Sequence, residues 1–289
     1  MKNNSGFTLI ELSIVLVIIG LIVGGVLVGR DLIKAAEIRA TISQLEKYNT
    51  ATNTFRNKYN YLPGDILSSQ ASAFGLYNVT GANANALAYG NGDGILQPEN
   101  DGGYTEGYSG EFAMFFLHLS QAGLVDGMYG AGGADTHLNG ATTTGGSYNG
   151  GIGYPQATAT ATTTTMIAEL LPPAKMGKGN FFMALSDYST NYFALVGMSN
   201  ISGAGSSAIV SVNNITPLEA YNIDKKIDDG YPATGRVFAF NANTANITGQ
   251  SIVVATTNGC VVFPLTNNYN VGDPNFNNKG ECALRFNFQ

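Results

Sequence analysis

A single carboxylate lies near the start of an otherwise apolar segment. Glu11 is the one ionisable residue between Gly6 and Gly29. A charge at the centre of a membrane helix costs about 2.5–3.5 kcal/mol, and less near the end of the span. A charge buried among packed helices is costly when no opposite charge pairs with it. The position of Glu11 therefore leaves two interpretations: a charge tolerated at the membrane interface, or a carboxylate that needs a partner in a bundle of helices.

A second group of oxygen-bearing side chains occupies the stretch NGDGILQPEND, residues 91–101. Asn91 and Asp93 fall where the third and fifth positions of an EF-hand-like loop would be, and Glu99 and Asp101 could add the hard oxygens that calcium binds. Tyr89 stands at the first position, however, where an oxygen ligand belongs. We therefore expect a polar Asp-Gly turn, with a calcium site as the alternative and no other cofactor.

Other candidates for chemistry are few. Asp224, Asp228 and Asp229 form a weaker acidic cluster, which the surface of a helix end explains. His118 lies in an apolar segment and is expected to pack rather than act as a base; the other histidine is His137. The chain contains no G-x-S-x-G, Walker A or G-x-G-x-x-G sequence. We predict no catalytic residue.

The two cysteines, Cys260 and Cys282, lie near the C-terminus. They are not in C-x-x-C spacing and have no histidine nearby, which disfavours a metal or redox site. One disulfide is expected if the compartment is oxidising.

The chain of 289 residues has a formal net charge of -6 and no cluster of Lys and Arg, so unaided binding to nucleic acid is disfavoured.

The N-terminal region is expected to form one long helix in two parts. Residues 7–29 are apolar throughout apart from Glu11, and this length suffices to span a bilayer as an α-helix. Residues 30–62 are expected to continue it as an amphipathic helix, because apolar residues recur at three- and four-residue intervals. These residues are Ile38, Ile42, Leu45, Tyr48, Phe55 and Tyr59. Pro63-Gly64-Asp65 is expected to end the helix.

Residues 63–289 are expected to form one α+β domain. Two further helices are predicted: one over residues 111–122, ended by Gly123, and one after Thr216, with Glu219 as the capping-box partner of that residue. Short apolar runs after Pro172-Pro173 predict an antiparallel sheet. The runs are FFMAL, YFALVGM, AIVSV, RVFAF, SIVVATT, CVVF and ALRFNF.

Two stretches of this domain have the composition of loops. Residues 66–110 consist mostly of turn formers, and residues 127–165 are rich in Gly, Ala and Thr. We expect residues 127–165 to form an exposed excursion with little core of its own.

The opening Gly6-Phe7-Thr8-Leu9-Ile10-Glu11 resembles the prepilin signature of type IV pilins and type II secretion pseudopilins. A short basic leader, MKNNSG, precedes Phe7, and Glu11 is the fifth residue after that junction. The resemblance implies that residues 1–6 are a leader, that prepilin peptidase cuts between Gly6 and Phe7, and that an N-methyltransferase modifies the new Phe7 amine. The fold of the family, a long N-terminal helix packed on an antiparallel sheet, agrees with the patterns above. The cysteine pair also resembles the disulfide-bounded loop of many pilins.

The resemblance further implies a location and partners. The subunit would be a single-pass protein of the bacterial inner membrane, with a cytoplasmic N-terminus and a periplasmic body. An inner-membrane assembly platform would extract it into a helical filament of identical or other pilin-like subunits, in the periplasm or outside the cell. There the ammonium of a neighbour's Phe7 is an available partner for Glu11.

Two features depart from the family pattern. Many pilins have a proline near the position of Val28, which this chain lacks, although Gly24, Gly25 and Gly29 could permit local loosening of the helix. The body is also larger than that of a typical major pilin. The Gly-x-x-x-Gly spacings within residues 20–29 fit either close helix approach or ordinary glycine enrichment in membrane helices.

Three hypotheses follow. The first is a structural subunit of a type IV pilus or type II secretion pseudopilus. The second is a minor, pilin-like tip subunit that acts in adhesion or DNA uptake. The third, a membrane-tethered enzyme, is disfavoured because the sequence offers no catalytic constellation.

Overall fold

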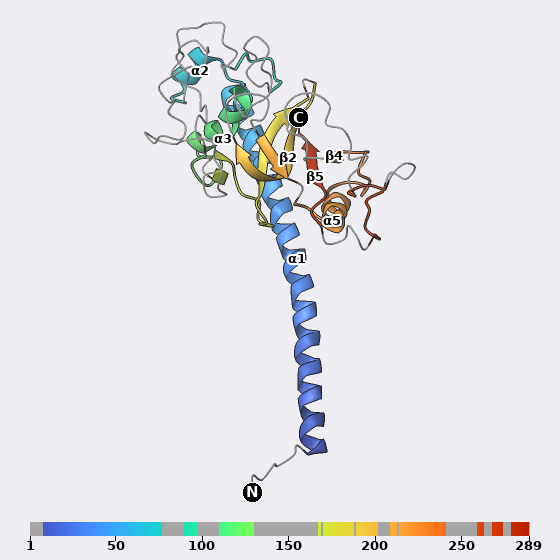
Figure 1. Ribbon diagram of the computed structural model, residues 1–289. Helices are drawn as coiled ribbons and strands as arrows, with labels where there is room; N and C mark the ends of the chain where they lie inside the picture. Colours follow the sequence, from blue (N-terminus) through green and yellow to red (C-terminus); the bar gives the residue numbers. More distant parts are fainter. Residues whose placement is uncertain are drawn as a thin grey trace, which may run out of the picture.

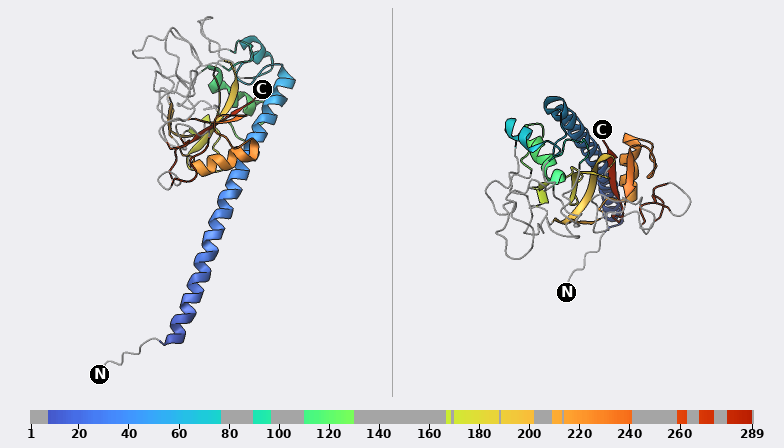
Figure 2. Two further views of the ribbon diagram at one scale, coloured as in Figure 1. Left: turned by 90° about the vertical axis from the view of Figure 1, so that its right-hand side faces the viewer. Right: turned by 90° about the horizontal axis from the view of Figure 1, so that it is seen from above.

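The computed structural model describes residues 8–76, 90–96, 110–129, 167–168, 170–187, 189–201, 209–212, 214–240, 259–262, 268–273 and 279–288. Among them a 51-residue helix, α1 (Leu9–Tyr59), extends far out of a body that combines helices and a sheet (Figure 1). The C-terminal part of α1 lies against that body, whereas its N-terminal half projects alone (Figure 2). The expected α+β arrangement of a long helix and an antiparallel sheet is confirmed.

The ends of α1 are set by local hydrogen bonds. Thr8 is the extended N-cap residue, so the helix begins at Leu9, two residues later than expected. At the other end Asn60 adopts the left-handed conformation, with φ of 61°, and its amide bonds the Arg56 carbonyl. The predicted helix to residue 62 was therefore too long, because Asn tolerates the left-handed region and ends the helix before Pro63 is reached.

The described sheet has five antiparallel strands: β1 (Asn180–Ser186), β2 (Asn191–Ile201), β3 (Ile209–Val212), β4 (Val237–Phe240) and β5 (Ala283–Asn287). Their order is β1-β2-β5-β4, and β3 also pairs with β2. Five of the seven predicted runs are confirmed as strands. The SIVVATT run lies outside the described residues. The prediction for CVVF was wrong for its described part, since residues 260–262 form only an isolated bridge between Val261 and Tyr269.

Among the described residues, shorter helices accompany the sheet, including α2 (Ser68–Ala73), α3 (Gly110–Gln121) and α5 (Pro217–Ile227). The predicted capping box of Thr216 and Glu219 begins α5, and Gly123, with φ of 68°, follows α3 as expected. The prediction of an irregular chain over residues 66–110 missed α2. Six residues without an amphipathic pattern give no periodic signal, so this helix depends on its surroundings.

The C-terminal half of α1 supplies one wall of the core. Its buried residues recur at intervals of one, three and four: Ile38, Thr41, Gln44, Leu45, Tyr48, Ala51, Thr52, Phe55 and Tyr59. Tyr48 packs edge-on against Phe116 of α3 and Phe182 of β1, with ring centroids 5.3 and 5.4 Å away. It also meets Phe193 of β2 at 6.2 Å. The amphipathic stripe predicted from the sequence is therefore the face of α1 that joins the sheet to α3.

Polar side chains of the same face hold the chain just before β1. Gln44 Nε2 donates to the carbonyl of Pro173 over 2.9 Å, and the amide of Lys175 donates to Gln44 Oε1 over 3.0 Å. The amide of Met176 donates to Thr41 Oγ1 over 2.9 Å. Thr41 thereby satisfies the buried amide of Met176, and Gln44 bonds part-buried backbone groups of the same segment.

Replacing Gln44 should measurably destabilise the body. Gln44→Ala removes the bonds to the Pro173 carbonyl, the Lys175 amide and the Tyr48 hydroxyl, and each such hydrogen bond contributes about 0.5–1.5 kcal/mol. We expect the free energy of unfolding to fall by about 2 kcal/mol or more, measured by denaturant titration of the protein in detergent. The exposed Glu46→Ala on the same helix is the control and should change it by less than about 0.5 kcal/mol. Equal effects of both variants would contradict this role of Gln44.

Candidate functional site

The carboxylate of Glu11 closes the first turn of α1. Glu11 Oε2 accepts hydrogen bonds from the backbone N–H and from the hydroxyl of Thr8, both over 2.8 Å. The amide of Glu11 donates back to Thr8 Oγ1 over 3.3 Å. This reciprocal arrangement is a capping box, which satisfies two backbone donors at the helix start. The negative charge also lies at the positive end of the helix dipole, where it is favourable.

This capping box was not predicted, although its signal is present in the sequence. Thr8-Leu9-Ile10-Glu11 has the spacing of Thr216-Pro217-Leu218-Glu219, from which the start of α5 was correctly predicted. Glu11 thus has a partner within its own chain.

The predicted cleavage residues Gly6 and Phe7 lie outside the described residues, and only Phe7 separates Gly6 from the N-cap residue.

Beyond Glu11, α1 presents an apolar surface to its surroundings. Large apolar side chains from Leu9 to Ile33 are half or more exposed, and Leu9 is 85% exposed. No charged residue occurs between Glu11 and Arg30. Among the described helices, α1 is long and apolar enough, by length and composition, to cross a membrane. So large an exposed apolar surface indicates a membrane or protein partner.

The glycines of this segment do not serve the fold of the single chain. A Cβ built on Gly20, Gly24, Gly25 or Gly29 would meet no atom within 4 Å. Their small size is therefore not required by any intramolecular contact of the described residues. Both interpretations of the glycines, close approach of a neighbouring helix and ordinary membrane-helix composition, remain compatible with this geometry.

The candidate calcium residues of the 90–96 segment take part in local turns. Asn91 Oδ1 accepts from the Asp93 amide over 2.9 Å, and Asp93 Oδ1 accepts from the Ile95 amide over 2.8 Å. Asn91 Nδ2 also donates to Asp93 Oδ2 over 2.9 Å. These contacts form the polar turn that the sequence predicted, and the calcium site stays the alternative. Glu99 and Asp101 lie outside the described residues.

The same segment folds around a buried carboxylate that sequence analysis did not identify. Asp65 accepts from the amides of Gly92 and Gly94, over 2.6 and 2.8 Å. Its side chain also forms a hydrogen bond with that of Glu111. Burial, the largest influence, raises the pKa of the Asp65 carboxyl from 3.8 to about 6, although the hydrogen bonds lower it. Asp65 serves here as an anion held by backbone amides.

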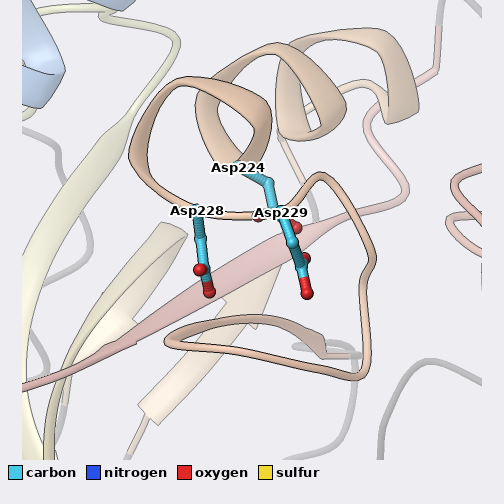
Figure 3. Close-up of side chains that lie close together, drawn as sticks. All are labelled: Asp224, Asp228 and Asp229. Atoms are coloured by element: carbon cyan, nitrogen blue, oxygen red, sulfur yellow. The ribbon is translucent and has the colours of Figure 1, made fainter.

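The acidic cluster lies at the C-terminal end of α5 and in the turn that follows it (Figure 3). Asp224, Asp228 and Asp229 bring carboxylate oxygens within 4.8 Å of one another. Each accepts hydrogen bonds from its own loop: Asp224 from the Gly230 amide, Asp228 from the Val237 amide and Asp229 from the Tyr231 amide. The cluster therefore stabilises the end of α5 and the turn between α5 and β4.

The disulfide between Cys260 and Cys282 joins the C-terminal segment to the sheet, with the two Cα atoms 5.1 Å apart. Cys282 also exchanges backbone hydrogen bonds with Ile215. Tyr269, between the two cysteines in sequence, donates its hydroxyl to Asp224 over 2.7 Å. Burial raises the pKa of the Asp224 carboxyl to about 6. The predicted cysteine pairing is confirmed.

His118 has a structural place in the core. Its ring is stacked on Phe55, with centroids 6.1 Å apart, and its Nδ1 accepts from the amide of Gly64 over 2.9 Å. The imidazole is 2% exposed. This supports packing over a role as a base. His137 lies outside the described residues.

Comparison with known proteins gives one match, at the N-terminus. Residues 1–27 match the family model described as "Prokaryotic N-terminal methylation motif", the signature of type IV pilins and pseudopilins. The match contains Gly6, Phe7 and Glu11 and ends within the exposed apolar half of α1. No curated protein and no solved structure gives a significant match.

Calcium should leave the 90–96 segment unaffected. Because Asn91 and Asp93 bond within their own turn, we expect the melting temperature to be the same with calcium and with chelator. The same independence is expected for Asp93→Ala. Thermal scans of both proteins measure this. A rise of several degrees with calcium in the wild type and none in the variant would establish a calcium site instead.

Proposed function

We propose that the protein is a structural subunit of a bacterial type IV pilus or type II secretion pseudopilus. The observation that carries this proposal is the exposed apolar half of α1, which runs from Leu9 to Ile33 and overlaps the methylation motif, residues 1–27. Its mechanism is polymerisation: prepilin peptidase removes residues 1–6, and the apolar helices of successive subunits then pack together in the filament. No chemical step is assigned to the body.

Before assembly the same apolar surface anchors the subunit in the inner membrane. The span from Leu12 to Gly29 carries no charge. Its exposed side chains are mostly apolar, so they are compatible with the hydrocarbon core of a bilayer. The body lies on the periplasmic side in this proposal. The Cys260–Cys282 disulfide is compatible with that oxidising compartment.

Glu11 takes two successive partners in this scheme. In the separate subunit Thr8 donates both of its hydrogen bonds to the carboxylate, which reduces the penalty of placing the charge near lipid. In the filament the neighbouring helices bury Glu11, and the ammonium of a neighbour's Phe7 pairs with it. Cleavage creates that ammonium and methylation retains its charge, so only processed subunits supply the second partner.

The buried titratable groups of the body serve its fold, which fits a structural role. His118 accepts from a backbone amide, Asp65 holds the 90–96 segment, and Asp224 accepts from Tyr269. A minor tip subunit that acts in adhesion or DNA uptake would use the same helix. The abundance of the protein along purified filaments, rather than at their ends, distinguishes the two roles.

The mature protein should begin at Phe7 with a methylated amine. The Gly6-Phe7 junction lies one residue before the N-cap of α1, where the chain leaves the helix. Mass spectrometry of the N-terminal peptide from cells with prepilin peptidase tests this. An intact Met1, or cleavage after residue 25, would refute the proposed processing.

Glu11→Leu and Glu11→Gln together test why the carboxylate is needed. Both remove the charge, but Gln retains an oxygen that can accept from Thr8. If the charge pairs with the Phe7 ammonium, both variants should be cleaved and inserted, yet both should fail to assemble. The loss of a buried partner costs about 3–5 kcal/mol, a factor of hundreds or more in association.

Fractionation and electron microscopy of the same cells measure insertion, processing and filaments. Thr8→Val is the matched control, because it removes the capping hydroxyl while retaining the charge. Normal filaments from Glu11→Gln together with loss of filaments from Glu11→Leu would show that helix capping, and not the charge pair, is the function of this residue.

A further inference from the structure

One side of α1 is basic between its apolar span and the body. Arg30 and Lys34 are exposed and lie four residues apart, so they share a helix face. The next residue of this row is Ile38, the first buried residue of the stripe that packs on the body. Both cations therefore project from α1 on the side that the body overhangs (Figure 2).

The end of the body nearest to these cations contains α5 and the turn before β1. α5 runs obliquely from α1 towards the side from which the projecting half of that helix leaves the body (Figure 2). The turn is tied to the beginning of the stripe, since Gln44 accepts from the amide of Lys175. Lys178 of the same turn pairs with Glu219 in the first turn of α5. These contacts keep the turn and α5 together at this end of the body.

The exposed side of α5 carries basic, aromatic and apolar side chains. Lys225 and Lys226 are exposed, and Leu218 is 48% exposed. Lys225 Nζ donates to the Tyr221 hydroxyl over 3.0 Å and lies 5.3 Å from the centroid of that ring. Lysine beside exposed apolar and aromatic side chains is typical of helices that lie at a membrane surface.

We name the cations at this end of the protein the basic underside. None of them forms an ion pair within 4 Å among the described residues, whose ion pairs involve other cations. The members of the basic underside are Arg30, Lys34, Lys175, Lys225 and Lys226.

The carboxylates near the basic underside leave its charge largely uncompensated. Asp228 and Asp229 at the end of α5 already accept from the amides of Val237 and Tyr231. The carboxylates of α1 between the span and the stripe are those of residues 31 and 37, fewer than the cations. A basic surface on a chain with a net charge of -6 indicates an anionic partner.

The dimensions of α1 identify that partner. At 1.5 Å per residue, Leu9 to Gly29 is about 30 Å long, which equals the hydrocarbon thickness of a bilayer, about 30 Å. Arg30 and Lys34 then lie in the headgroup layer, which is about 5–8 Å thick on each side. Ile38, where the body begins, lies only about 12 Å beyond Arg30. The underside therefore faces lipid headgroups across a gap that long lysine side chains can bridge.

The distribution of charge along the chain adds an independent argument. Basic residues that flank a membrane span are normally enriched on the cytoplasmic side. In the proposed topology Lys2 is removed with the leader, whereas Arg30 and Lys34 stay on the periplasmic side. A favourable contact with headgroups on that side accounts for their presence there.

We propose that the basic underside is a docking surface for anionic phospholipid headgroups of the leaflet from which α1 emerges. The inference rests on the proposed membrane-anchored subunit and adds a second contact to it. Each basic residue near an anionic surface favours the docked position about five-fold. The body of the unassembled subunit is thereby held against the membrane in one orientation, and extraction into a filament must break these contacts.

Lysine labelling of the full chain in nanodiscs tests the docking surface. One copy per disc is placed in phosphatidylcholine alone, or in equal parts of phosphatidylcholine and phosphatidylglycerol, and amine acylation is read by mass spectrometry. The labelling rates of Lys34, Lys225 and Lys226 should fall about five-fold or more with phosphatidylglycerol, and high salt should restore them. Lys58, exposed at the far end of α1, is the internal control and should not change. Equal labelling of the underside in both discs would overturn the proposal.

A pair of double variants tests whether the charges of α5 hold the body down. Lys225→Gln with Lys226→Gln should return the labelling of Lys175 in phosphatidylglycerol discs to within about two-fold of its rate in phosphatidylcholine, because two contributions of about five-fold are lost. Arg56→Gln with Lys58→Gln removes the same charge from exposed positions far from the underside and should leave Lys175 protected. Equal protection of Lys175 in both double variants would overturn the proposal.

The remaining outcomes separate this inference from the proposed function. Protection that appears only in discs holding several copies would assign the surface to contacts between subunits and overturn the lipid proposal. Normal insertion with equal labelling in both lipids would do the same, while leaving the filament subunit unaffected. Normal filaments from Glu11→Leu would instead refute the proposed assembly contact, and the labelling by lipid composition would still decide the docking surface.

Discussion

Tyr48 is the point at which α1, α3 and the sheet meet. Its ring contacts Phe116, Phe182 and Phe193, and its hydroxyl accepts from Gln44, which also bonds the chain before β1. Burial raises its pKa far above the ordinary value of 10, so the hydroxyl stays neutral. This aromatic junction, with the other buried residues of the same helix face, fixes the second half of α1 to the body.

The division of α1 into two environments follows directly from that junction. The residues from Ile38 onward present a stripe to the body, whereas those before Arg30 are apolar around the whole helix and exposed. A helix with one apolar face is stabilised by a globular partner, and a helix that is apolar all round needs lipid or other helices. Glu11 is compatible with the second environment because Thr8 satisfies its carboxylate locally.

The sequence predicted the features that depend on local pattern, and it missed those that depend on distant contacts. Short apolar runs located five strands of the sheet, and Thr216-x-x-Glu219 located the start of α5. The capping box at Thr8 was equally readable, but the carboxylate of Glu11 was interpreted only as a charge in an apolar segment. Asp65 was taken for a helix stop, because its partners lie 27 and 29 residues away and no spacing rule connects them. The proposed charge pair of Glu11 and the proposed cleavage site both involve Phe7, which lies outside the described residues.

The unbroken length of α1 has a mechanical consequence. A pull along the helix axis at its N-terminal end reaches the body through the stripe between Ile38 and Tyr59, which runs parallel to the force. Contacts arranged in this way are loaded in shear, so they must fail together rather than one after another. The bonds from Thr41 and Gln44 lie at the end of the stripe that is loaded first. The Cys260–Cys282 bond joins the C-terminal segment and lies off this path, so tension would be borne by packing and hydrogen bonds while the covalent crosslink stays unstressed.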